Sequence, residues 1–299
     1  MPDITNHLRT NLTSFCLALL GGLFCSAAIA QEVTTEQLTD SIYVIKGKGG
    51  NIGVFMGEDG TFMIDDKFAP MSENILKAMK SMGGSAPKYL LNTHFHGDHS
   101  GGNENFGEMG ATIVAHFNVH QRLVDGSTIA AFSMETPPAP NTALPVITFD
   151  SEIVFSINGE RVRVFHVPGA HTDGDAMVHF EGSNLIHTGD VFFNGFYPFI
   201  DVSNGGSVQG VIDAASQALA LADENTIIIP GHGPIADKAQ LLAYRDMLVV
   251  VEKRLSKLKA QGMMAKEVIA EVPLTDLEQA WGNGMFSSDK WIGIIYDGI

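Results

Sequence analysis

The chain has 299 residues, of which 45% are hydrophobic, and its formal net charge is −16 at pH 7. This acidic charge argues against nucleic acid or an anionic membrane as a partner, because both are bound through Lys and Arg side chains that neutralise phosphates. The hydrophobic content and length can supply a sizeable core. We therefore expect a soluble globular protein, and the sequence leaves its oligomeric state open.

The first segment, residues 1–30, is predicted to be a signal peptide. An apolar run over residues 15–30 ends in Ala-Ile-Ala, which has the small-residue pattern of a cleavage site. The alternative is an uncleaved membrane anchor, but this run is shorter than the roughly 20 apolar residues that span a bilayer. We expect cleavage after Ala30, a periplasmic or secreted mature chain that begins at Gln31, and no membrane insertion of that chain.

Cleavage would also remove Cys16 and Cys25, the only two cysteines. The mature chain could then form neither a disulfide nor a thiolate metal site, so a bound metal would need imidazole, carboxylate and water as ligands. Residues 31–299 have a length that suits a single large domain.

Short strands open the mature chain. Alternating or continuous apolar runs are separated by turn residues such as Asp59-Gly60, and they predict strands over residues 41–47, 51–57 and 61–66. Residues 72–83 have helical spacing, with Ser72 as a candidate N-cap. Residues 88–94 predict a strand that runs into a histidine cluster.

The remaining chain repeats this order of strands followed by helices. A strand is predicted over residues 111–116 and a short helix over 118–124, and three prolines predict a loop without regular structure over 134–145, which could border a substrate pocket. Further predicted elements are hairpins over 147–169 and 175–193, helices over 207–223 and 237–261, a strand over 226–230, and a last strand or packed extension over 289–298. The chain thus has two successive series of strands, each followed by helices. This order predicts an α/β sandwich, in which two sheets pack together and the helices lie outside.

The stretch "HFHGDH", residues 94–99, places four potential metal ligands in six positions. His94 and His96, two apart on an extended segment, project to one side, and Gly97 permits a sharp turn before Asp98 and His99. Imidazole and carboxylate are ligands that zinc prefers, and a catalytic zinc needs only three protein ligands. The cluster alone is too small for two ions.

Three further candidates follow predicted strands, each beside glycine or a turn: His171 in "GAHTDGD", Asp190 in "HTGD" and His232 in "PGHG". A single loop histidine is ordinarily a surface residue. The density of the cluster, together with these companions, favours a metal site instead. His187, three residues before Asp190, is expected to be a packing residue.

The motifs "THFHGDHSGG", "GAHTDGD", "HTGDVFF" and "PGHG", in this order, resemble those of the metallo-β-lactamase superfamily. The resemblance covers nearly all of the mature chain and implies an αββα four-layer sandwich with metals at one edge of the sheets. It implies two Zn²⁺ ions, the first held by His94, His96 and His171, the second by Asp98, His99 and His232, with Asp190 bridging. Asp65, one position before Asp66, matches the family's first acidic motif and would orient a ligating imidazole or the Asp98 loop.

The resemblance further implies a zinc-dependent hydrolase in which a metal-bridging hydroxide attacks a carbonyl of a small-molecule lactam, lactone, ester or thioester. Asp98 would be catalytic, holding the hydroxide in line or moving its proton. Ligand types alone do not decide between zinc, iron and manganese. The aromatic run that contains Phe193 and Tyr197 would supply these two rings to a substrate pocket.

Two alternatives remain open from the sequence. The first is a true class B β-lactamase that degrades antibiotics, although Asp190 and Phe193 stand where one lactamase branch has Cys and Lys. The second belongs to another class, a periplasmic metal-binding or relay accessory protein of a quinoprotein oxidation system without hydrolase activity. Substrate turnover distinguishes all three possibilities.

Overall fold

The computed structural model of the chain describes residues 32–299. The predicted signal peptide, residues 1–30, therefore lies outside the described residues. Across the part that is described, none of the helices combines the length and the apolar character needed to cross a membrane.

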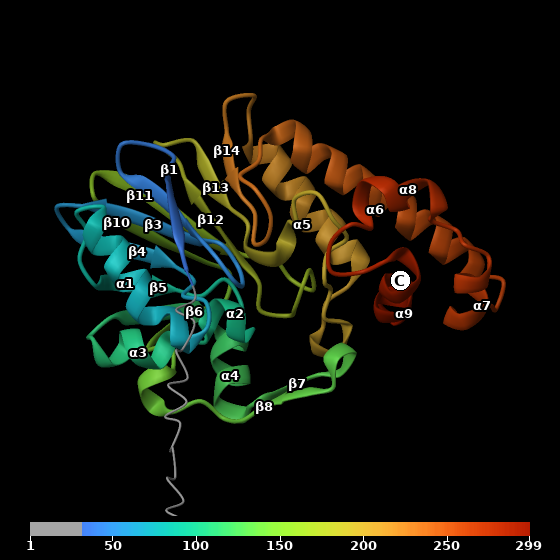
Figure 1. Cartoon of the computed structure of the whole chain (residues 1–299), viewed down its shortest axis with the longest axis horizontal. Coiled ribbons are helices and arrows are strands. Elements are labelled where there is room, and N and C mark those ends of the chain that lie inside the picture. Colours follow the sequence, from blue (N-terminus) through green and yellow to red (C-terminus); the bar gives the residue numbers. More distant parts are fainter. Residues whose placement is uncertain (1–31) are drawn as a thin grey trace, which may run out of the picture.

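Two β-sheets form the centre of the molecule (Figure 1). The first sheet has the strand order β1 (Thr34–Gln37), β2 (Ile42–Lys46), β3 (Ile52–Gly57), β4 (Gly60–Ile64), β5 (Pro87–Leu91), β6 (Thr112–His116) and β9 (Ile147–Phe149). The second has the order β10 (Glu152–Ile157), β11 (Glu160–His166), β12 (Ala176–Phe180), β13 (Leu185–His187) and β14 (Ile227–Ile229). A separate hairpin joins β7 (Ser127–Ile129) to β8 (Met134–Thr136).

Helices cover the outer faces of both sheets (Figure 1). On the side of the first sheet lie α1 (Ser72–Ser81), α2 (Gly97–Ser100), α3 (Asn103–Glu108) and α4 (Phe117–Asp125). On the side of the second sheet lie α5 (Val208–Leu221), α6 (Lys238–Lys259), α7 (Ala265–Ala270), α8 (Thr275–Trp281) and α9 (Ser288–Ile295). The predicted α/β sandwich, with two packed sheets and helices outside, is confirmed.

The core explains why the layers stack in this way. Alternate side chains of both sheets point into one shared apolar layer, where the rings of Phe55 and Phe180 meet edge to face at 5.4 Å. Each such buried phenyl group stabilises the fold by about 1.5–3 kcal/mol relative to leaving it exposed. On the outer face of the first sheet, Ile75 and Met79 of α1 pack over Val54.

Local turn chemistry sets the hairpins that the sequence predicted. Asn158 and Gly159 both have positive φ angles, 52° and 74°, and they join β10 to β11 with Ile157 paired to Glu160. This is the geometry that an Asn-Gly pair supplies to a two-residue hairpin. The three strands predicted at the start of the mature chain correspond to β2, β3 and β4, which pair antiparallel, and β1 adds a strand that the sequence did not predict.

The strand directions bring the polar motifs to one edge of the sandwich. β4 and β5 run parallel in the first sheet, and β13 and β14 run parallel in the second. Asp65 directly follows β4, the cluster at residues 94–99 follows β5, and Asp190 and His232 follow β13 and β14. The carboxyl ends of parallel strands meet at one edge, where open α/β sheets bind their ligands.

Three predictions about individual elements need correction. Ser72 does not cap α1, because a 3₁₀ turn over Ala69–Met71 runs straight into the helix and makes Met71 the N-cap. Residues 134–136 form β8, since the first proline comes only after this strand ends. The C-terminal segment is not a strand but the helix α9, and its buried Trp291 and Ile295 agree with the alternative of a packed extension.

Candidate metal centre

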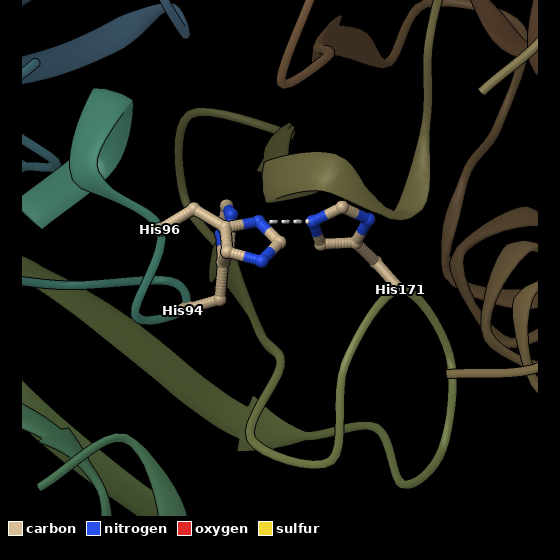
Figure 2. Close-up of side chains that lie close together, drawn as sticks. All are labelled: His94, His96 and His171. Atoms are coloured by element: carbon tan, nitrogen blue, oxygen red, sulfur yellow. Dashed lines mark hydrogen bonds between the residues drawn. The ribbon is translucent and has the colours of Figure 1, made fainter. Parts of the chain in front are cut away.

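The first group of side chains, here called the triple-histidine group, consists of His94, His96 and His171 (Figure 2). The two former residues lie in the turn after β5, and the third comes from the loop between β11 and β12. The Nδ1 atom of His96 lies 2.9 Å from Nε2 of His171. All three side chains are buried, and one nitrogen of each lies within 4.8 Å of the others.

The second group, here called the Asp98 group, consists of Asp98, His99 and His232. The first two lie on the short helix α2, and the third follows β14 in the opposite sheet. The Asp98 carboxylate lies 3.3 Å from Nε2 of His232 and 3.7 Å from Nε2 of His99. Side-chain exposures of 25% for Asp98 and 16% for His232 mean that this group reaches solvent, whereas the triple-histidine group does not.

Asp190 lies between the two groups. Its Oδ2 atom is 3.8 Å from His94 Nε2 and 3.6 Å from His171 Nε2, and also 3.3 Å from His232 Nε2. Its Oδ1 atom is 3.0 Å from His99 Nε2. The structure thus brings all seven side chains that the sequence named to one place, with Asp190 in the middle.

The ring nitrogens that point away from the two groups have hydrogen-bond partners elsewhere in the protein. Asp65 accepts a hydrogen bond of 2.7 Å from Nδ1 of His99, and it also accepts bonds from the backbone and hydroxyl of Thr93. Asp201 lies 3.0 Å from Nε2 of His96, and the carbonyl of Phe199 lies 2.8 Å from Nδ1 of His171. Such partners fix the tautomer and the ring orientation of ligating histidines.

Charge and burial divide the imidazoles into two kinds. Burial holds the pKa of His94 well below its usual range and lowers the pKa of His171 to about 4, so both are neutral, as metal ligands must be. Burial alone would lower the pKa of His232, but the Asp190 carboxylate outweighs it and raises that pKa to about 9. Burial disfavours the charged form of Asp190, yet the charge of His99 holds its pKa well below the usual range.

The donor set fits a pair of metal ions. The Nε2 atom of His94 is buried without a hydrogen-bond partner, and Oδ1 of Asp190 faces His99 Nε2 without forming a well-aligned bond. Buried polar atoms are ordinarily paired, so atoms that converge without bonding to one another fit a cation as their common partner. The clusters of His and Asp are consistent with a binuclear site, and they do not identify the metal.

Of the two aromatic residues expected in a substrate pocket, the structure places neither on an open surface. Phe193 is 1% exposed and stacks on the His232 ring at 4.9 Å, so it supports an imidazole of the site. Tyr197 is fully buried, with its ring stacked on Trp291 at 4.3 Å. The prediction for Tyr197 is wrong, because the chain turns this ring into the core against α9.

Other neighbours of the site could not be found from motifs. Asp201, Asn51 and Lys67 contact the site or the loops that carry it, although no sequence pattern singles them out. In contrast, His187 lies outside the two groups and hydrogen bonds to the carbonyl of Asn51 at 3.2 Å, in agreement with its expected packing role. Asp66, the neighbour of Asp65, accepts from the Gly102 amide instead of from a histidine.

Comparison with known proteins identifies the class. The Metallo-beta-lactamase superfamily model matches residues 45–232, well over half of the chain, so the chain belongs to this superfamily. With the His and Asp clusters, this membership makes it a metal-dependent hydrolase of the metallo-β-lactamase fold.

Individual relatives are distant. The chain is 26% identical over 160 residues to the probable metallo-hydrolase YqgX of Bacillus subtilis (strain 168), covering 52% of this chain and 72% of the relative. It is 25% identical over 209 residues to the acyl-coenzyme A thioesterase MBLAC2 of Gallus gallus, covering 62% and 73%.

Among solved structures, the inverting sec-alkylsulfatase Pisa1 from Pseudomonas sp. aligns with a TM-score of 0.66 and 16% identity. The alignment covers 89% of this chain and 50% of the sulfatase chain. At this level of identity the similarity shows a shared fold.

Proposed function

We propose that the chain is a two-metal hydrolase that cleaves a small-molecule lactam, lactone, ester or thioester at its carbonyl carbon. The triple-histidine group would hold the first ion, the Asp98 group the second, and Asp190 would bridge them. The observation that carries this proposal is the position of Asp190, whose carboxylate lies within 3.8 Å of an imidazole nitrogen from four different histidines.

Bound ions would lower the pKa of water to about 7 and polarise the substrate carbonyl, so that hydroxide is available near neutral pH. Asp98 is suited to hold that hydroxide in line or to take up its proton. Burial opposes ionisation of this carboxyl, but the charge of His99 and a hydrogen bond from His232 outweigh burial and keep its pKa at about 2. The carboxylate is thus anionic at every relevant pH, and its 25% exposure leaves it within reach of a substrate.

An apolar acyl or aryl group is the favoured substrate portion. Phe199 packs against His96 and His171 with ring centres 5.7 and 5.5 Å away, and Phe132 packs on Phe199 at 4.8 Å. Phe132 lies in the β7–β8 hairpin and is 42% exposed, so it presents an aromatic surface to solvent, and the buried Phe199 connects this surface to the histidines. The thioesterase relative from Gallus gallus supports an acyl substrate.

Zinc is the favoured metal, since five imidazoles and two carboxylates match its preference for nitrogen and oxygen ligands. Iron and manganese use the same ligand types, so elemental analysis of the purified protein is needed to identify the bound metal.

We also propose that the chain is exported and cleaved after Ala30. The intact mass of the protein recovered from the periplasm or medium would then correspond to a chain beginning at Gln31.

The test is a substrate panel of lactams, lactones, aryl esters and acyl thioesters, assayed with the zinc-loaded protein. His96→Ala should abolish turnover, whereas the matched control His179→Ala, on β12 outside both groups, should retain it. Turnover restricted to lactams would favour the class B β-lactamase. Two bound ions without turnover of any compound would favour the accessory protein, and equal rates in the wild type and His96→Ala would refute the metal-hydrolase proposal.

A further inference from the structure

One short loop lies against Asp98 and His99 and against the segment that carries His232. It spans residues 47–51 between β2 and β3, and is here called the glycine loop because it contains Gly47, Gly49 and Gly50. No metal-binding motif includes it. Its contacts nevertheless join the two sheets at the point where α2 and the loop after β14 meet.

On one side, the glycine loop lies directly against Asp98 and His99, the two members of the Asp98 group on α2. The amide of Gly50 donates to the carbonyl of Asp98 at 3.3 Å. A Cβ atom on Gly50 would lie 2.1 Å from Cε1 and 2.3 Å from Nε2 of His99. Only glycine allows this approach, and Nε2 is the His99 atom that faces Asp190.

Toward β14, Asn51 holds the segment that carries His232. Its Nδ2 atom donates to the carbonyls of Pro230 at 2.9 Å and Gly233 at 3.0 Å, on either side of the histidine. Its backbone amide donates to the carbonyl of Gly231 at 2.7 Å. The Asn51 side chain is buried, so these bonds do not compete with water.

From the interior, Lys67 anchors the same loop. This lysine is fully buried, and its ammonium group donates to the carbonyl of Gly50. Lysine is almost never fully buried without partners, because desolvation of its charge is costly. Burial lowers the pKa of Lys67 to about 8, and the charges of Asp98 and Asp65 oppose that shift.

We infer that Asn51 and Lys67 are positioning residues that set the geometry of the second metal position through the glycine loop. Lys67 fixes Gly50 against His99 and Asp98, and Asn51 fixes the His232 segment to the same loop. The triple-histidine group has no hydrogen bond to this loop among the described residues. The inference rests on the proposed two-ion site and adds which residues outside the ligand set hold one half of it.

A selective effect on the second ion distinguishes positioning from general stabilisation. Outer partners of metal ligands change metal affinity by about 10–100-fold when they are replaced. Asn51→Asp keeps the shape of the side chain but removes both donated bonds, and Lys67→Met keeps its length but removes the charge and the donated bond. Both variants should weaken the second ion at least tenfold and leave the first ion within about threefold of the wild type.

The matched controls are an Asn→Asp and a Lys→Met substitution at positions away from the metal centre. Asn158→Asp removes an amide bond to the carbonyl of Gly60, at the opposite ends of the strands. Lys259→Met removes bonds from a lysine to the carbonyls of Tyr296 and Ile299. Metal-stripped forms of all proteins are titrated with Zn²⁺ against a chromophoric chelator, bound metal is counted by elemental analysis, and thermal unfolding of each stripped protein is recorded.

The inference is supported if Asn51→Asp and Lys67→Met lose the second ion while both controls bind two ions as the wild type does. It is overturned if both variants bind two ions with wild-type affinity, or if they lose both ions equally. A wild type that binds fewer than two ions would overturn the two-metal proposal and this inference together. Two wild-type ions with unaffected variants would overturn this inference alone.

Discussion

The bond between Asp201 and His96 offers a quantitative test of the first metal position. Asp201 is 1% exposed, and its Oδ2 atom lies 3.0 Å from Nε2 of His96, which leaves Nδ1 to face His171. The same carboxylate accepts from the hydroxyl of Ser203 and the amide of Asn204. Asp201→Asn keeps these shapes and removes the charge.

The size of the effect follows from the change in bond type. A hydrogen bond to a charged group contributes about 1.5–3 kcal/mol, and one between neutral groups contributes about half of this. The asparagine oxygen can still accept from His96 while its amide faces Ser203, whose hydroxyl can turn to accept. The loss is therefore about 0.8–1.5 kcal/mol, and its upper end corresponds to a roughly tenfold weaker first ion.

The assay is competition for Zn²⁺ between the protein and a chelator, with Asp276→Asn as the control because that carboxylate pairs with Arg254 away from the site. We expect the ion of the triple-histidine group to weaken about tenfold in Asp201→Asn, with the other ion unchanged. Wild-type affinity for both ions, or a selective loss of the second, would refute the assigned role of Asp201.

Three further predictions follow from the same geometry. Phe132→Ala should raise KM severalfold for long acyl or aryl substrates and leave KM for acetyl esters unaffected. Equal changes of KM for both kinds of substrate in steady-state kinetics would count against substrate binding by the aromatic surface. Phe180→Ala should lower the free energy of unfolding by about 3–5 kcal/mol in denaturant titrations, because it opens a cavity between the sheets. Despite burial, Asp190 raises the pKa of His99 and of His232, the latter to about 9, so both are protonated at pH 7 and metal affinity should rise as the pH increases toward 9. Calorimetry in buffers of different ionisation enthalpy should then register release of about two protons, and a heat independent of the buffer would contradict this.

The features predicted correctly from the sequence are those that neighbouring residues determine. Residues 94–99 converge because they follow one another through the turn after β5 and into α2, which begins at Gly97. Asn158 and Gly159 specify their hairpin through backbone conformations that few other residue pairs adopt. The order of strands and helices then indicated the sandwich, and the resemblance to the superfamily implied that the site lies at one edge of the sheets.

The features that were missed depend on contacts between distant parts of the chain. Asp201 meets His96 across 105 positions, and Asn51 meets Pro230 across 179, so no local spacing could reveal either bond. The aromatic run near the site looked suited to a substrate, but packing against Trp291 takes Tyr197 into the core. Ser72 has a good capping side chain, yet the preceding 3₁₀ turn removes the need for a cap.

Activity during stepwise metal loading tests the central claim most directly. The metal-stripped protein is titrated with Zn²⁺ while bound ions are counted and hydrolysis of an aryl ester or acyl thioester is followed. If the triple-histidine group, the Asp98 group and Asp190 hold two ions that act together, full activity should appear only at about two bound ions per chain. Full activity at one ion, or activity unchanged in the stripped protein, would contradict the proposed two-metal hydrolase.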